Sequence, residues 1–335
     1  MIGTRRHAAA AAALLPAVTL LTGCSGSDQN ALAPESHQSG DIASMFWWMV
    51  GGAWIGLALI VALLIWSWRR AHRPGLGGDT HGDKPGEKAA WYVVLGLGIA
   101  TPIVVMAAIF VIGDIFVIKT TEAPAANATK LTVQVIGHQW WWEVRYPGTT
   151  AVTANELHIP VRTPVRIDVT TADVIHSFWV PRLNRTIDAI PGRVNSIELY
   201  ADAVGRYRGQ CDEFCGLQHA HMAFYVYADP PAKFRTWLAN QEQPVRAPLP
   251  AAFNTAGCST CHTIRGTSAS GDVGPDLTHL ASRSTLAALA IPNRRDYLAH
   301  WIVDAQSIKP GNLMPNLHLS SRELSALLTY LKGLK

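Results

Sequence analysis

The chain has 335 residues, of which 49% are hydrophobic and only 16% are charged, and its net charge is +4. This balance favours a membrane protein with water-exposed parts over a wholly soluble protein. A charge this small and this spread out argues against nucleic-acid binding. The length is enough for two or three domains.

The N-terminus has the pattern of an export signal. Arg5 and Arg6 precede an apolar run over 8–21 that is too short to cross a bilayer. The run ends in Leu-Thr-Gly-Cys at Cys24, which resembles the lipobox of bacterial lipoproteins. We therefore predict a signal peptide over 1–23 and lipidation of Cys24. The alternative is an ordinary signal peptide followed by an incidental cysteine.

Two uncharged apolar stretches follow, Ile42–Trp68 and Ala89–Gly113. Each is longer than the roughly 20 residues that a helix needs to cross a bilayer, and tryptophans lie near their ends, where membrane interfaces favour them. A buried helical hairpin is the alternative, but length without charge argues against it. We predict a transmembrane two-helix hairpin over 42–118.

The loop between these stretches is basic, and the positive-inside rule therefore places it in the cytoplasm. Its basic residues are Arg69, Arg70, Arg73, Lys84 and Lys88. Both the N-terminus and everything after Asp114 are then expected on the outer side of a bacterial cell membrane, in agreement with an exported N-terminus.

After a linker of small residues at 122–129, the pattern changes to the period of two that is typical of strands. The clearest strand patterns are Leu131–Val135, Val165–Val169, Ser196–Tyr200 and Ala223–Tyr227. Prolines separate these patterns. Short strands of this kind predict a β-sandwich or barrel over 126–230.

The segment 209–222 has the sequence GQCDEFCGLQHAHM and combines two thiols, an imidazole and a thioether. Soft sulfur and nitrogen ligands suit copper, which also accepts a weak methionine. Zinc is one alternative, although zinc has little use for a thioether. A disulfide between Cys211 and Cys215 is a second alternative, and packing roles for His219 and Met222 are a third.

A second imidazole for this site must come from elsewhere in the chain. His176 is the best candidate, because it lies between two strand patterns, where a loop could meet the segment 209–222. His158 and His221 are the alternatives. His221 lies two residues after His219 and is expected to point the other way on an extended segment.

The last part of the chain contains Cys258-Ser-Thr-Cys261-His262, after a predicted linker over 231–250. C-x-x-C-H is the attachment sequence of c-type haem, with two thiols for the vinyl groups and an imidazole for the iron. A thioredoxin-like redox pair is the alternative, but no βαβ pattern surrounds these cysteines. We predict a haem domain over 251–335.

Met314 is the expected sixth iron ligand, because it lies in a loop before a predicted final helix over 320–333. A methionine ligand raises the iron potential. That helix begins with a capping box of Ser320 and Glu323. The competing imidazoles, which we expect to be surface or core residues, are His279, His300 and His318.

Four segments resemble subunit II of haem–copper cytochrome c oxidases and occur in the order found in that family, after two apolar stretches. They are GHQWWW (137–142), DVIHSFWVP (173–181), DAIPGR (188–193) and the copper loop at 209–222. The resemblance extends over residues 42 to 230, and residues 250 to 335 resemble a class I cytochrome c, including Gly-Pro-Asp-Leu at 274–277. The implied fold is a transmembrane hairpin, a cupredoxin domain and an all-α cytochrome c domain.

The resemblance implies a dinuclear copper centre (CuA) in the copper loop. Cys211 and Cys215 would bridge both coppers, and His176 and His219 would each bind one of them. Met222 and the backbone carbonyl of the residue at position 213 would complete the ligand set.

The resemblance also implies that the Glu213 side chain binds Mg²⁺ at the interface with the catalytic subunit, and that Trp140 is the point of electron entry. One position departs from the family pattern. Many members have a glutamate three residues before the tryptophan that opens the second span, and this position is Lys88 here. Glu87 is out of register and is expected to be an ordinary solvated charge.

We therefore expect the electron-entry subunit of a proton-translocating terminal oxidase. Electrons would pass from cytochrome c or a similar external donor through haem c and CuA to subunit I, where oxygen is reduced. No catalytic residue is expected on this chain. The alternatives are a CuA subunit of a nitric oxide reductase and a free-standing, membrane-tethered electron carrier.

Overall fold

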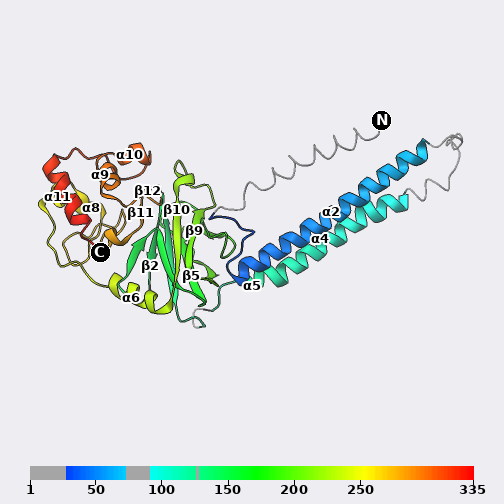
Figure 1. Cartoon of the computed structure of the whole chain (residues 1–335), viewed down its shortest axis with the longest axis horizontal. Coiled ribbons are helices and arrows are strands. Elements are labelled where there is room, and N and C mark those ends of the chain that lie inside the picture. Colours follow the sequence, from blue (N-terminus) through cyan, green and yellow to red (C-terminus); the bar gives the residue numbers. More distant parts are fainter. Residues whose placement is uncertain (1–27, 73–90, 126–127) are drawn as a thin grey trace, which may run out of the picture. The chain divides into compact units, whose positions relative to one another are not determined.

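The computed structural model describes residues 28–72, 91–125 and 128–335, which belong to two compact units (Figure 1). One unit is Gly40–Glu122, and the other combines Met1–Ser39 with Ala123–Lys335. The predicted signal peptide, Cys24, Glu87 and Lys88 lie outside the described residues.

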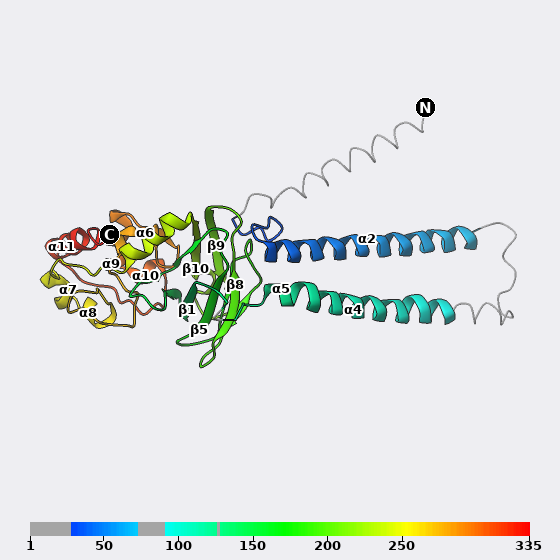
Figure 2. The same cartoon turned by 90° about the horizontal axis from the view of Figure 1, so that it is seen from below.

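Both predicted spans are helical over the residues that the structure describes. The first is α2 (His37–Ala71), and the second comprises η2 (Val94–Ala100), α4 (Thr101–Ile112), η3 (Gly113–Ile118) and α5 (Lys119–Thr121). The helices His37–Arg70 and Trp91–Ile112 are long and apolar enough to cross a membrane, and they run antiparallel (Figure 2). Large side chains such as Trp48 and Tyr92 are exposed. This exposure suits a lipid environment better than the interior of a soluble protein.

Two five-stranded sheets follow within the described range 128–335. The first has the order β3 (Val152–Ala154), β2 (Trp141–Arg145), β1 (Thr132–His138), β5 (Val165–Thr171), β8 (Asn195–Leu199). The second has the order β4 (Glu156–Pro160), β10 (Ala223–Asp229), β9 (Gly205–Cys211), β6 (His176–Trp179), β7 (Ile187–Ala189). The β1–β5 and β4–β10 pairs are parallel, and the other pairs are antiparallel.

The two sheets share a core because alternate residues of each strand point inward. On β5, Val165, Ile167 and Val169 are fully buried, and the residues between them are only partly buried. The rings of Phe178 and Phe224, which both belong to this core, stack with centroids 4.7 Å apart. The four predicted strand patterns are confirmed, and so is the predicted β-domain.

The segment 231–250, which we expected to be a linker, begins with helix α6 (Pro231–Gln241). Phe234 of this helix belongs to the core of the β-domain, and Trp237 packs edge-on against Tyr146 with centroids 5.3 Å apart. Only the part after α6 therefore connects the domains without regular structure of its own.

The C-terminal domain has a separate apolar core that includes Phe253, Leu298 and Leu327. Its elements are α7 (Ala251–Thr255), α8 (Cys258–Cys261), η5 (Leu280–Ser282), β11 (Thr285–Leu286), β12 (Ile291–Pro292), α9 (Arg295–Val303), α10 (Ala305–Ile308) and α11 (Ser321–Leu331). The predicted capping box at the start of α11 is confirmed.

Candidate copper and haem centres

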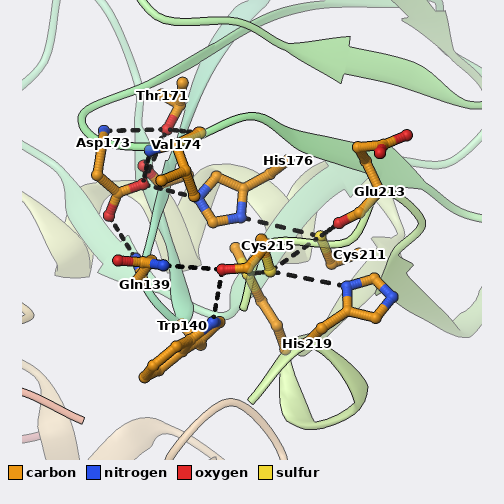
Figure 3. Close-up of polar contacts among 12 residues, drawn as sticks. Gln139, Trp140, Thr171, Asp173, Val174, His176, Cys211, Glu213, Cys215 and His219 are labelled. Atoms are coloured by element: carbon orange, nitrogen blue, oxygen red, sulfur yellow. Dashed lines mark hydrogen bonds and ion pairs between the residues drawn. The ribbon is translucent and has the colours of Figure 1, made fainter. Parts of the chain in front are cut away.

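The copper loop connects β9 to β10, and β6 lies beside β9 in the same sheet. β9 ends at Cys211, and the short helix η4 (His219–His221) precedes β10. His176 is the first residue of β6, so it lies in a strand rather than in the loop that we expected. Because β6 pairs with β9, the imidazole reaches the two thiols (Figure 3).

The predicted copper ligands converge on one buried point. The Sγ atoms of Cys211 and Cys215 are 3.8 Å apart. The His176 Nδ1 atom lies 3.9 Å from Cys211 Sγ, and the His219 Nδ1 atom lies 3.6 Å from Cys215 Sγ. The Met222 Sδ atom is 3.8 Å from Cys215 Sγ. Each imidazole thus faces a different thiol, and both thiols face each other.

The ligand atoms of His176, Cys211 and Cys215 all lie within 4.8 Å of one another, and the three residues are buried. A disulfide needs its sulfur atoms about 2.05 Å apart, so the two cysteines are not bonded to each other here. A largely buried cluster of thiol, imidazole and thioether groups fits copper, as the choice of ligand types predicts.

Glu213 contributes to this cluster through its backbone. Its carbonyl oxygen lies 3.3 Å from Cys211 Sγ, and its carboxylate points away from the sulfur atoms (Figure 3). The side chain is exposed. It is therefore free to meet a group outside the sulfur cluster.

Asp173 orients the His176 ring. Its carboxylate lies 2.8 Å from Nε2 of His176, which leaves Nδ1 to face the thiols. Burial alone would lower the pKa of His176, but the hydrogen bond to Asp173 and the nearby Cys211 raise it overall. Burial likewise opposes the lowered pKa of Asp173, which the hydrogen bonds from His176 and two backbone N–H groups produce. A carboxylate behind a ligating histidine is a common feature of metal sites.

The two thiols differ in how readily they lose a proton. The hydrogen bond between the two sulfur atoms lowers the pKa of Cys211 to about 4, against the effect of burial and with help from His176. The same contact, together with burial, raises the pKa of Cys215. One thiolate therefore forms easily, whereas a metal that binds both sulfur atoms must displace the second proton.

The two alternative histidines do not join the cluster. His158 Nδ1 lies 2.7 Å from Asp229 Oδ2, and the ring stacks between Tyr227 and Trp237. His221 Nδ1 is hydrogen-bonded to Gln218 Oε1 at 2.8 Å. This contact lies within the copper loop and stabilises its conformation.

A cavity of about 220 Å³ is lined by Cys258, Cys261 and His262 and by mostly apolar side chains. His262 Nδ1 donates to the Pro275 carbonyl over 2.8 Å, which leaves Nε2 free for a metal. Gly274 makes this arrangement possible, because a Cβ atom there would lie 2.5 Å from His262 Cε1. Burial lowers the pKa of His262, so the neutral form that can bind iron is favoured. These features fit a c-type haem.

Met314 also lines this cavity, whereas His279, His300 and His318 do not. His279 Nε2 lies 3.0 Å from the Gln243 carbonyl, and His300 Nε2 lies 3.1 Å from Ser307 Oγ. Met314, rather than the competing imidazoles, is therefore placed to reach a group held in this cavity.

Trp140 lies between the two centres. Its indole Nε1 donates to the Cys215 carbonyl over 3.0 Å, and Gln139 Nε2 donates to the same oxygen over 2.8 Å. Trp140 and Trp141, although they belong to the β-domain, also line the haem cavity. One side chain thus contacts the copper loop and the cavity at once.

Two residues of this region, Asp173 and Lys309, are not predicted from the sequence as part of the site. Asp173 lies within a segment that the sequence singled out, but nothing in its spacing to His176 marks it as a hydrogen-bond partner. Lys309 donates from Nζ to the Trp140 carbonyl over 2.6 Å. These two residues are 169 positions apart, and no sequence motif connects them.

The fold and these centres define a protein with two candidate membrane helices, a cupredoxin-like domain and a cytochrome c domain. Residues 149–228 match the family model described as the periplasmic domain of cytochrome c oxidase subunit II, and residues 250–335 match that of cytochrome c. The chain is 30% identical over 331 residues to cytochrome c oxidase subunit 2 of Alkalihalophilus pseudofirmus, with 94% of each chain covered. The chain belongs to the cytochrome c oxidase subunit 2 family.

The chain is also similar to other proteins. Cytochrome c oxidase subunit 2 of Bacillus sp. strain PS3 is 29% identical over 258 residues, which cover 70% of this chain and 72% of the relative. The crystal structure of the periplasmic domain of cytochrome oxidase subunit II of Bradyrhizobium japonicum is 32% identical. It covers 36% of this chain and 96% of its own, with a TM-score of 0.34.

Proposed function

We propose that this chain is the electron-entry subunit of a membrane-bound cytochrome c oxidase. It would receive electrons from an external donor such as cytochrome c and pass them, through haem c and CuA, to the oxygen-reducing subunit I. The observation that carries this proposal is the position of Trp140, which is hydrogen-bonded to the copper loop and lines the haem cavity.

The residues of the chain have distinct parts in this proposal. Cys211 and Cys215 would bridge two coppers, His176 and His219 would each bind one, and Met222 with the carbonyl of the residue at 213 would complete the set. Cys258, Cys261, His262 and Met314 would hold the haem. When bound, each centre can accept and release one electron. The protein's own contribution is to hold the ligands in a buried, fixed arrangement and to place Trp140 between them.

The remaining assignments follow from the same function. The exposed Glu213 carboxylate would bind Mg²⁺ at the interface with subunit I. The helices α2 and α4 would anchor the chain in a bacterial cell membrane, with residues 126–230 and 251–335 as the copper and haem domains on its outer side. A signal peptide over 1–23 and lipidation at Cys24 complete this topology. Coupling to proton translocation would depend on the partner subunits.

The test is the absorption and electron paramagnetic resonance spectrum of the purified oxidase complex. We expect c-haem bands and a mixed-valence copper signal, in which one electron is shared by two coppers. Zinc without copper, or the absence of haem, would contradict the proposal.

The substitution Cys215→Ser tests the copper centre separately from the haem centre. It removes one bridging sulfur, so the mixed-valence signal should be lost while the c-haem bands remain, because Cys215 does not line the haem cavity. Consumption of oxygen against nitric oxide by the same complex separates an oxidase from a nitric oxide reductase.

A further inference from the structure

Lys309 connects the haem domain to the copper domain. It lies between α10 and α11, upstream of Met314, and it is only 3% exposed. Its Nζ donates to the carbonyls of Trp140 (2.6 Å), His221 (2.9 Å) and Ala287 (3.2 Å). The first two carbonyls belong to the copper domain, and the third belongs to the haem domain. Three acceptors match the three N–H bonds of an ammonium group.

A buried cation is costly unless polar partners replace the lost water. Burial lowers the pKa of Lys309 to about 7, which reflects this cost. Two of its three acceptors are present only while the domains are in contact. The ammonium group therefore favours the state in which the haem domain contacts the copper domain.

The residues after Lys309 extend this contact. The Pro310 carbonyl accepts a hydrogen bond from Gln218 Nε2 over 2.9 Å. Gly311, with φ of +82°, lies so close to the copper domain that a Cβ atom there would be 3.1 Å from Leu217 Cδ2 and 3.7 Å from Trp140 Cη2. The segment 309–311 thus touches the copper loop and Trp140 on one side and leads to Met314 on the other.

We propose that Lys309 is a positioning residue that holds the haem domain against Trp140 and the copper loop. This inference rests on the proposed electron transfer from haem to copper. It follows that the two centres exchange electrons through one fixed contact rather than through a domain that moves on residues 242–250. Because the haem domain covers Trp140, which is 8% exposed, an external donor must deliver its electrons to the haem domain.

Lys309→Met tests this proposal in the full-length chain within the oxidase complex. Backbone amide hydrogen exchange is measured in peptides that cover 139–141 and 217–222. Hydrogen bonds to charged groups are among the stronger ones, so we expect exchange at these sites to rise by about tenfold or more. The c-haem bands and the mixed-valence copper signal should be unchanged, because neither ligand set is touched. Electron transfer from haem to copper after flash reduction should become slower.

Lys332→Met is the matched control. Its Nζ also donates to a backbone carbonyl, that of Asn293 at 3.0 Å, but both residues lie within the haem domain. This variant should leave exchange at 139–141 and 217–222 as in the wild type.

Ser284→Ala is a second, milder variant at a separate point of the same contact. Ser284 is hydrogen-bonded to Glu156 Oε1 at 2.6 Å and to the Tyr227 hydroxyl at 2.8 Å across the two domains. It should raise exchange in the same peptides by a smaller factor. If Lys309→Met does not fold, this variant still tests whether the contact between the two domains protects these peptides from exchange.

Unchanged exchange and an unchanged transfer rate in Lys309→Met, with both cofactors in place, would overturn the inference. Loss of the copper or haem signal in the wild type would instead overturn the proposed function, and the exchange data would still report on the contact between the domains.

Discussion

At the scale of single residues, the carboxylate of Asp173 determines how the His176 ring is oriented in the copper site. Asp173 accepts from His176 and from the backbone N–H groups of Gln139 and Val174. It thereby fixes the ring with Nδ1 toward the sulfur atoms and links the β1–β2 turn to the first residue of β6. A ligand oriented in this way loses less freedom when it binds a metal.

Asp173→Asn should weaken copper binding. The substitution keeps the shape of the side chain but removes the charge that raises the pKa of His176, and loss of such a partner costs roughly tenfold to a hundredfold in metal affinity. Copper retention against a competing chelator measures this effect. Asp202→Asn, at an exposed carboxylate of the same domain, is the control. Equal retention in the two variants would contradict a role for Asp173.

Residue identities were predictable where the chemistry is contiguous in the chain. Cys211, Cys215, His219 and Met222 lie in one loop, and this soft ligand set favours copper over zinc. Cys258-x-x-Cys261-His262 is likewise a local pattern. Asp173 was not predictable, because an aspartate near a histidine is common and only the β6–β9 pairing shows which way the ring faces.

At the scale of elements, β10 and α6 are joined by a buried polar group. Asp229, the last residue of β10, contacts His158 of β4 and Lys233 of α6, both over 2.7 Å. Burial alone would raise the pKa of Asp229, but these two hydrogen bonds lower it overall. The aspartate therefore stabilises the folded domain in its ionised form.

The sign of the resulting pH dependence follows from the lowered pKa. The stabilisation is fully present above the unfolded pKa of about 3.9 and is lost as the pH falls through the lower folded pKa. The thermal midpoint of the copper domain should therefore decrease more steeply below about pH 4 in the wild type than in Asp229→Asn. Circular dichroism of the full-length chain measures both midpoints. Parallel acid profiles would show that Asp229 does not contribute.

Elements were predictable where the hydrophobic period is regular. The strands β1, β5, β8 and β10 alternate clearly, and α11 has both a capping box and a helical stripe. β9 has the sequence Gly-Arg-Tyr-Arg-Gly-Gln-Cys. Because a glycine takes one of its buried positions, the alternation of apolar and polar residues is hard to see in the sequence. The two prolines that open α6 predict a linker, but proline is also favoured in the first turn of a helix, and a helix forms here.

At the scale of the whole chain, the contact between the copper and haem domains could not be predicted from the sequence. Trp140 and Lys309 are 169 positions apart, and Arg265 reaches the Thr150 carbonyl over 2.6 Å across 115 positions. Only folding brings these pairs together. This contact makes Trp140 part of two sites, which suits the proposed electron path between haem and copper.

The most direct measurement is the rate of electron transfer from flash-reduced haem c to oxidised copper in the intact complex, with and without Trp140→Leu. We expect haem oxidation and copper reduction to occur together in the wild type. In Trp140→Leu, where the static spectra of both centres should persist, transfer should be markedly slower. Unchanged transfer in the variant, or copper reduction that precedes haem reduction when the external donor is supplied, would contradict this expectation.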